Sequence, residues 1–217
     1  MKTVAILSQK GGSGKTTTAL HLAVEAFRAD QSAVVIDLDP QGSATSWFEA
    51  RKRSGHPSEP IVMPTHPAQL EAMLNNLRGQ EADWAFIDTA PQSDNLAVKA
   101  AELADLVIIT CKPSVMDLRA IQSTLRLTQI AGVTPYVLLT QTEPQGTRHK
   151  EAAATLTDLD VQIIPFVTTK RVAYMDSLID GQTASEFEPA GRAADESRQI
   201  FNHIEKLAQA SRKEQAA

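Results

Sequence analysis

The chain has 217 residues, a formal charge of −5 at pH 7, 42% hydrophobic residues and 5% aromatic ones. This length and composition suit a single α/β domain over residues 1–210, and they exclude a disordered, fibrous or membrane-spanning chain. The negative charge argues against a surface that binds nucleic acid everywhere, although it leaves room for a local basic patch.

Both ends of the chain and its cysteine content predict a cytoplasmic protein. The first predicted strand begins too early to leave room for a signal peptide, and the single Cys111 cannot form an internal disulfide. The polar residues 211–217 should fray, and they lack the large apolar side chains of a membrane-binding amphipathic helix. We therefore expect no membrane partner.

A glycine-rich loop follows the first predicted strand, Val4 to Leu7, and precedes a helix predicted from Thr16 to Arg28. Glycines lack Cβ atoms, so the backbone of such a loop can turn sharply and direct several N–H groups at one anion. The positive N-terminal end of the helix adds to this attraction. We expect phosphate to bind here, with Lys15 reaching the β- and γ-phosphates and the Thr16 hydroxyl binding magnesium. The expected nucleotide-binding residues of the loop are Lys10, Gly11, Gly12, Ser13, Gly14, Lys15, Thr16 and Thr17.

Two carboxylates follow the next predicted strand, which begins at Ala33. In open α/β sheets, ligands bind outside the carboxyl ends of the strands. We therefore expect Asp37 to point toward the metal and Asp39 to lie in the loop above it.

The segment that follows is predicted to be a surface connection. A short helix should cover residues 43–54 and end in a solvated basic run at 51–53. An edge strand at 61–63 and a helix at 69–77 should follow.

A third strand end carries the next acid. Trp84 to Ile87 is typical of a buried strand, and Asp88 follows it directly. We expect Asp88 to hold Mg²⁺ through a water, because this ion gives up its water ligands reluctantly.

The rest of the chain continues the alternation of strands and helices. Strands are predicted at 106–111, 135–140 and 161–165, the last as a core strand, and helices at about 115–131, 148–159 and 192–209. This order predicts a mostly parallel, twisted sheet with helices on both faces. After the strand at 135–140 the chain reads Thr140-Gln-Thr-Glu143 in place of the Asn-Lys-x-Asp that reads guanine, which favours ATP over GTP.

Several of these segments resemble motifs of the ParA/MinD superfamily of P-loop ATPases. Lys10-Gly-Gly-Ser-Gly-Lys-Thr16 resembles the deviant Walker A motif, whose additional lysine marks the group, and Asp37-Leu-Asp-Pro-Gln41 resembles its Walker A′ motif. Asp88-Thr-Ala-Pro91 resembles the Walker B loop, with Ala90 as a modest departure. Lys112-Pro-Ser and Asp117-Leu118 are similar to a segment near the dimer interface, and residues 166–186 to a segment near the C-terminus.

The resemblance implies a small ParA-type partition ATPase that hydrolyses ATP with Mg²⁺. It implies a homodimer that encloses ATP, in which Lys10 of each subunit reaches the other's phosphates and Asp39 orients the attacking water, so that Lys10, Lys15 and Asp39 are the catalytic residues. It further implies that Pro165, Phe166 and Val167 lie near the adenine. Such a dimer binds DNA nonspecifically on the nucleoid and segregates plasmid or chromosomal DNA, and a ParB-class partner stimulates its hydrolysis.

Two other functions remain open from the sequence. The first is a ParA-like ATPase that positions a protein assembly on the nucleoid. The second is a ligase of the dethiobiotin-synthetase type, which is disfavoured by the additional lysine of the motif, Lys10. The DNA contacts can be given only as candidates, which are Lys170, Arg171, Arg192 and Arg198.

Overall fold

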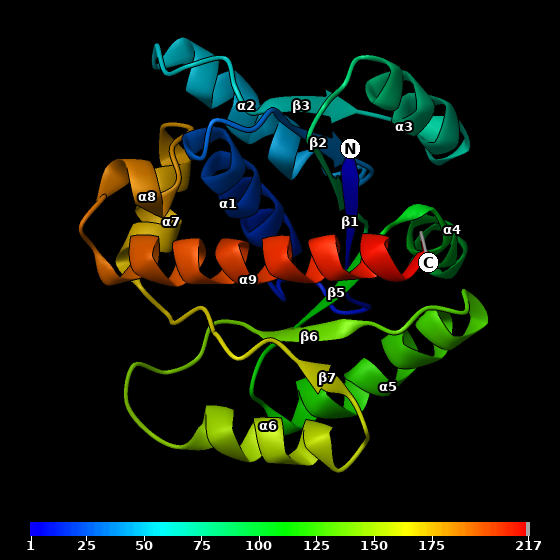
Figure 1. The fold of residues 1–217 in the computed structure, drawn as a ribbon. Coiled ribbons are helices and arrows are strands. Elements are labelled where there is room, and N and C mark those ends of the chain that lie inside the picture. The colour runs from blue at the N-terminus through cyan, green and yellow to red at the C-terminus, as the bar shows by residue number, and fades with distance from the viewer. Residues whose placement is uncertain (216–217) are drawn as a thin grey trace.

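The computed structural model describes residues 1–215, with side chains described up to residue 210. Its centre is a seven-stranded sheet in the order β3-β2-β4-β1-β5-β6-β7, in which all neighbouring strands are parallel (Figure 1). The strands are β1 Lys2–Leu7, β2 Ala33–Asp37, β3 Ile61–Pro64, β4 Trp84–Asp88, β5 Leu106–Cys111, β6 Tyr136–Leu139 and β7 Gln162–Ile163. The predicted fold class is confirmed.

Helices cover both faces of the sheet. One apolar cluster joins the sheet to α1 and α9, and the other joins it to α3, α4, α5 and α6. Figure 1 shows α1 and α9 on the near side and α5 and α6 beneath β6 and β7. The helices are α1 Lys15–Arg28, α2 Ser43–Arg53, α3 Leu70–Gly79, α4 Asp94–Leu103, α5 Val115–Ile130, α6 Arg148–Thr157, α7 Val172–Ile179, α8 Ala184–Phe187 and α9 Arg192–Gln215, with a 3₁₀ turn η1 at Pro67–Gln69.

The central strand β1 shows why the sheet is buried on both faces. Val4 and Ile6 point into the cluster that contains α1, while Ala5 and Leu7 point into the opposite cluster, and all four side chains are fully buried. Parallel strands with helices on both faces require such a continuous apolar run.

The register of the strands brings the predicted strand-end acids together. β4 lies between β1 and β2, and Asp88 is paired with Ile6 on one side and with Asp37 on the other. The loop after β1 and the carboxylates of β2 and β4 therefore meet at one edge of the sheet.

Some local predictions were wrong. The strand predicted at 161–165 is shorter, because β7 has two residues at the edge of the sheet and pairs only with β6. Gln162 is exposed, although Ile164 of the same segment lies in the core. Helices α4, α7 and α8 were not predicted. Helix α9 runs to Gln215, beyond the predicted end at Gln209 and into the tail expected to fray, whose residues 216 and 217 lie outside the described part.

The basic run at 51–53 is not simply a solvated helix end, because Arg51 is fully buried. Its guanidinium forms two hydrogen bonds with the Glu186 carboxylate, at 2.7 and 3.0 Å, and donates further bonds to the carbonyls of Gly181, Pro57 and Glu59. A buried cation requires such partners. A Cβ on Gly181 would lie 2.1 Å from the backbone nitrogen of Arg51, so only glycine fits there.

Within residues 1–215, none of the helices combines the length and the apolar character that crossing a bilayer requires.

Candidate functional site

The loop between β1 and α1 has the backbone of an anion-binding turn. Gly14 caps α1 with φ of 95°, and Gly12 has φ of 70°, both in the left-handed region that favours glycine. Helix α1 begins at Lys15, and no acidic side chain occupies its first turn. The positive end of the helix and the N–H groups of the loop are thus available to phosphate.

Polar side chains from the ends of β5 and β6 hold this loop in place. The Ser13 hydroxyl lies 3.0 Å from that of Thr110, and the Thr140 hydroxyl donates to the Ser13 carbonyl at 2.7 Å. The side-chain amide of Gln141 donates to the Gly12 carbonyl at 2.9 Å. These bonds fix the loop before any ligand binds, which reduces the entropy that binding must lose. No pattern in the sequence predicted that Thr110, Thr140 or Gln141 supports the loop, although all three lie at or directly after the end of a predicted strand.

Lys15 occupies the centre of this arrangement and is only 6% exposed. Its ammonium donates to the Lys10 carbonyl at 3.4 Å. Burial lowers the pKa of Lys15, and the nearby charges of Asp88 and Asp39 oppose this shift. A buried cation with one weak hydrogen bond is well placed to gain an anionic partner.

Asp88 fits a magnesium site because its carboxylate lacks partners. Both oxygens are buried, and neither has a described partner with the geometry of a hydrogen bond, although the Thr16 hydroxyl lies close enough to affect the carboxylate. Burial raises the pKa of Asp88 to about 7, an effect that the Thr16 hydroxyl opposes and the Asp37 carboxylate increases. Unpaired buried carboxylates are costly, so Asp88 and the neighbouring Thr16 hydroxyl offer oxygen atoms that suit a cation, and their roles as metal ligands stay predictions.

The raised pKa of Asp88 predicts a pH-dependent stability. The folded-state pKa of about 7 lies above the ordinary value of 3.8, so the folded protein binds more protons than the unfolded chain between these values. The free energy of unfolding of the nucleotide-free protein should therefore fall as the pH rises from about 4 to about 7. Asp88→Asn should remove this fall in the free energy of unfolding. Urea unfolding of parent and variant in EDTA, at pH 5 and at pH 8, measures the difference. An equal pH dependence in parent and variant would contradict the assignment, and added Mg²⁺ should stabilise only the parent at pH 8.

Asp37 is already satisfied by protein groups. One carboxylate oxygen accepts from the Thr45 N–H at 2.9 Å and from the Thr45 hydroxyl at 2.7 Å, and the other accepts from the Asp39 N–H at 3.2 Å. In this conformation Asp37 ties the start of α2 to the loop that carries Asp39. Its predicted role as a metal ligand stays a prediction.

Asp39 lies in that loop and is half-buried. One of its oxygens accepts from the Gln41 N–H at 2.9 Å, and its carbonyl accepts from the Gly42 N–H at 2.8 Å. The other carboxylate oxygen accepts no hydrogen bond from the described residues, so it is available to a water or a ligand. Asp39, Gln41, Ser43 and Pro91 face the glycine loop across a cavity of about 350 Å³.

Lys10 points away from this cavity. Its ammonium lies 3.2 Å from a carboxylate oxygen of Asp117, near the start of α5, and the Lys10 side chain is 42% exposed. We call the glycine loop and the start of α1 the cradle. The subunit therefore supplies Lys15 to its own cradle and holds Lys10 at the outer surface.

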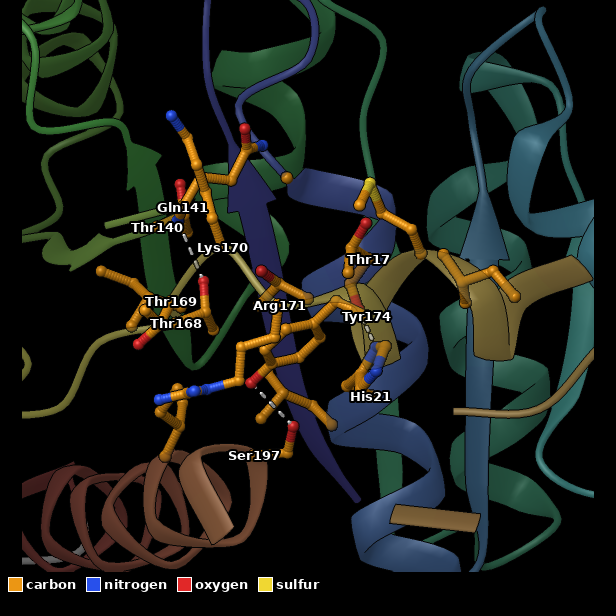
Figure 2. A pocket seen from close by; sticks show the side chains of 17 residues that line it. Thr17, His21, Thr140, Gln141, Thr168, Thr169, Lys170, Arg171, Tyr174 and Ser197 are labelled. Carbon is orange, nitrogen blue, oxygen red and sulfur yellow. Dashed lines mark hydrogen bonds between the residues drawn. The ribbon is translucent and has the colours of Figure 1, made fainter. Parts of the chain in front are cut away.

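A second cavity, of about 380 Å³, opens beside Gly14 and Thr17 (Figure 2). It is lined mainly by apolar groups of α1, α7 and α9 and by polar groups of the segments after β6 and β7. Among the described residues, the predicted adenine contacts Pro165, Phe166 and Val167 do not line this cavity, whereas the residues 168–171 that follow them do.

The walls of this second cavity are fixed by buried polar contacts. His21 donates from Nδ1 to the Thr17 carbonyl at 2.8 Å and accepts the Ala184 N–H at Nε2, and burial lowers its pKa to about 4, so it is neutral. The Tyr174 hydroxyl lies 3.2 Å from the Ser197 hydroxyl, as Figure 2 shows. These contacts hold α1, α7 and α9 around a preformed space.

The four predicted DNA contacts are mostly engaged in ion pairs. Lys170 pairs with Glu143 at 2.6 Å, Arg171 with Glu196 at 2.8 Å and Arg198 with Asp195 at 3.8 Å. Arg192 is exposed and unpaired among the described residues. Other exposed cations without an ion pair in the described part are spread over several helices, namely Arg28, Arg53, Arg78, Arg119, Arg126, Arg148, Lys150 and Lys206.

The chain is similar in sequence to known nucleotide-binding proteins. The profile of the CobQ/CobB/MinD/ParA nucleotide binding domain matches residues 4–184. Maintenance of carboxysome distribution protein A of Halothiobacillus neapolitanus is 26% identical over 210 residues, which cover 93% of this chain and 95% of that protein. The protein of the same name from Gloeobacter kilaueensis is 34% identical over 147 residues, or 67% of this chain and 65% of that protein. The chromosome-partitioning ATPase Soj of Thermus thermophilus is 34% identical over 125 residues, or 54% of this chain and 49% of that protein.

Solved structures share the fold at low sequence identity. A Cyanothece McdA variant in complex with ATP has a TM-score of 0.74 and 20% identity, and covers 95% of this chain and 96% of its own. MinD of Aquifex aeolicus has a TM-score of 0.77 and 15% identity, and covers 95% and 98% of the two chains.

Proposed function

Because the chain belongs to the CobQ/CobB/MinD/ParA nucleotide binding domain family, we propose that it is an ATPase whose ATP-bound dimer binds DNA and distributes a cargo along it. The observation that carries this proposal is that the two lysines at the glycine loop occupy different positions. Lys15 lies inside the cradle of its own subunit, whereas Lys10 is held at the surface by Asp117.

The phosphates of ATP bind the glycine loop and the start of α1, where Lys15 pairs with them. Thr16 and Asp88 would hold Mg²⁺, whose charge offsets that of the phosphates. Asp39 lines the cavity beside the glycine loop and has a carboxylate oxygen without a protein donor among the described residues, and it orients the water that attacks the terminal phosphate. The adenine enters the adjoining cavity beside Gly14 and Thr17, at the face formed by residues 168–171.

Two subunits meet at the edge of the sheet where these groups lie. Lys10 then exchanges Asp117 for the phosphates of the neighbouring subunit's nucleotide, so that binding ATP and pairing subunits become one linked event. Positive charge placed opposite the charge of the reacting phosphate stabilises the transition state, which explains why an additional lysine promotes hydrolysis.

Lys10→Ala separates nucleotide binding from dimer formation. We expect the variant to bind ATP with nearly the affinity of the parent but to remain a single subunit, because the cradle is intact and the bridging cation is missing. Light scattering with saturating ATP and Mg²⁺ measures the mass, and Lys52→Ala, which removes an exposed lysine of α2, is the matched control. A full ATP-dependent dimer in Lys10→Ala would refute the role of Lys10 across the interface.

The cargo we favour is a protein assembly. A relative that matches over nearly its whole length is a carboxysome distribution protein, whereas the chromosome-partitioning relative Soj matches over about half of its length. Both readings share the same ATP-driven cycle and differ only in the partner that stimulates hydrolysis. Segregation of plasmid or chromosomal DNA, with a ParB-class partner, is the second candidate.

The experiment that tests the proposed function is an ATPase assay with and without nonspecific DNA and a candidate partner. We expect DNA and partner together to raise turnover, and DNA binding to require ATP and to weaken as salt rises, because phosphate contacts release counterions. Binding that is independent of ATP or salt would contradict the proposal. Deletion of the gene followed by imaging distinguishes the two cargoes. If the cargo is a protein assembly, its position in the cell should become irregular, and if the cargo is DNA, the inheritance of that DNA should fail.

A further inference from the structure

Lys112 brings another positive charge to the glycine loop. It is the first residue after β5, the neighbour of β1, and its side chain reaches across to the loop that follows β1. A Cβ placed on Gly12 would lie 3.8 Å from the Lys112 ammonium nitrogen. The ammonium is therefore next to the backbone that is expected to hold phosphate.

This ammonium has no protein partner. Among the described residues, none offers Lys112 a carboxylate or a hydrogen-bond acceptor for its side chain, although Lys10 is paired with Asp117 and Lys15 is bonded to the Lys10 carbonyl. Lys112 is nevertheless only partly exposed. An ammonium beside an anion-binding loop that has no carboxylate partner among the described residues is placed to form a charge-assisted contact with an anion held there.

The backbone of Lys112 is fixed, which limits where its side chain can reach. Pro113 restricts the preceding residue to extended conformations, the Lys112 carbonyl accepts the Ser114 N–H at 2.8 Å, and the Cys111 carbonyl accepts the Thr140 N–H at 2.8 Å. Thr140 also supports Ser13 of the glycine loop. The same contacts thus position both the loop and the lysine beside it.

We propose that Lys112 binds the terminal phosphate of the nucleotide held by its own subunit. This rests on the proposed function, which places a nucleoside triphosphate in the cradle. Lys112 approaches on the side of Gly12, whereas Lys15 approaches from the start of α1, so the two cations flank the phosphates. A cation at the terminal phosphate favours ATP over ADP and keeps the resting subunit selective for the triphosphate.

The test compares the affinities of Lys112→Met for ATP and ADP in the presence of Mg²⁺. We expect the ATP affinity to fall by roughly tenfold and the ADP affinity to change less than about twofold, as the loss of one charge-assisted contact to a single phosphate predicts. Lys112→Arg should keep most of the ATP preference. Lys99→Met, which removes an exposed lysine of α4 paired with Glu71, is the matched control and should change neither affinity.

The outcomes separate this inference from the function on which it rests. Equal losses for ATP and ADP, or no loss for either, would overturn the role of Lys112, while a parent protein that binds neither nucleotide would overturn the proposed function itself. Repeating the titration in the Lys10→Ala background, with single subunits verified by light scattering, tests which subunit holds the phosphate. The ATP-selective loss should persist there, and its disappearance would refute contact within one subunit.

Discussion

Lys15→Ala should abolish measurable nucleotide binding. Lys15 is the buried cation of the cradle, and each charge-assisted contact to phosphate contributes about 1.5–3 kcal/mol. Loss of two such contacts weakens binding by roughly 10²- to 10⁴-fold. Titration calorimetry with ATP and with ADP measures the effect, and both nucleotides should be affected because Lys15 lies at the start of α1.

The fold of Lys15→Ala should survive. Burial lowers the pKa of Lys15, so its charge does not stabilise the nucleotide-free protein. Thermal unfolding of the variant without nucleotide should therefore remain cooperative. Lys52→Ala is again the matched control. A folded Lys15→Ala protein that binds ATP like the parent would show that the glycine loop is not the phosphate site.

Asp39→Ala should bind ATP and form the dimer but hydrolyse it slowly. Asp39 lines the cavity and keeps one carboxylate oxygen without a protein donor among the described residues, and removing a group that orients or activates a water reduces turnover by roughly 10²- to 10⁴-fold. Single-turnover hydrolysis measures this step apart from product release. We expect the variant to accumulate as an ATP-bound dimer, which light scattering detects.

A matched control for Asp39→Ala is Asp195→Ala, which removes an exposed carboxylate of α9. Turnover in this control should equal that of the parent. Equal turnover in Asp39→Ala and the parent would remove Asp39 from the chemical step, and loss of ATP binding in Asp39→Ala would assign the residue to the cradle instead.

The sequence predicted the parts of the site that follow from local rules. The glycine loop and the acids at 37, 39 and 88 follow apolar strands, and parallel strands bring their carboxyl ends to one edge, where the structure pairs Asp37 with Asp88. The burial of β1 on both faces was likewise predicted, because Val4 to Leu7 form a continuous apolar run.

The parts that the sequence did not predict depend on contacts between distant segments. Arg51 is buried against a carboxylate partner, Glu186, that lies 135 positions away in the sequence. Without that partner, the basic run around Arg51 is typical of a solvated helix end. Thr140 supports the glycine loop from 127 positions away. No local pattern distinguishes such a threonine from others at a strand end.

The position of the second cavity also required the structure. Helix α7 was not predicted, and this helix brings Tyr174 against Ser197 and closes the cavity beside Thr17. The resemblance implied that residues 165–167 lie near the adenine, and this stays a prediction. The wall of the cavity is formed by residues 168–171, because the position where the chain turns after β7 is not specified by periodicity.

A crystal structure of Asp39→Ala with ATP and Mg²⁺ tests the central claim most directly. We predict two subunits with ATP enclosed between them, phosphates on the glycine loop, the metal beside Thr16 and Asp88, and the Lys10 ammonium moved from Asp117 to the neighbouring subunit's phosphates. A single subunit that binds ATP with Lys10 still on Asp117 would contradict the claim, as would an empty glycine loop at saturating ATP.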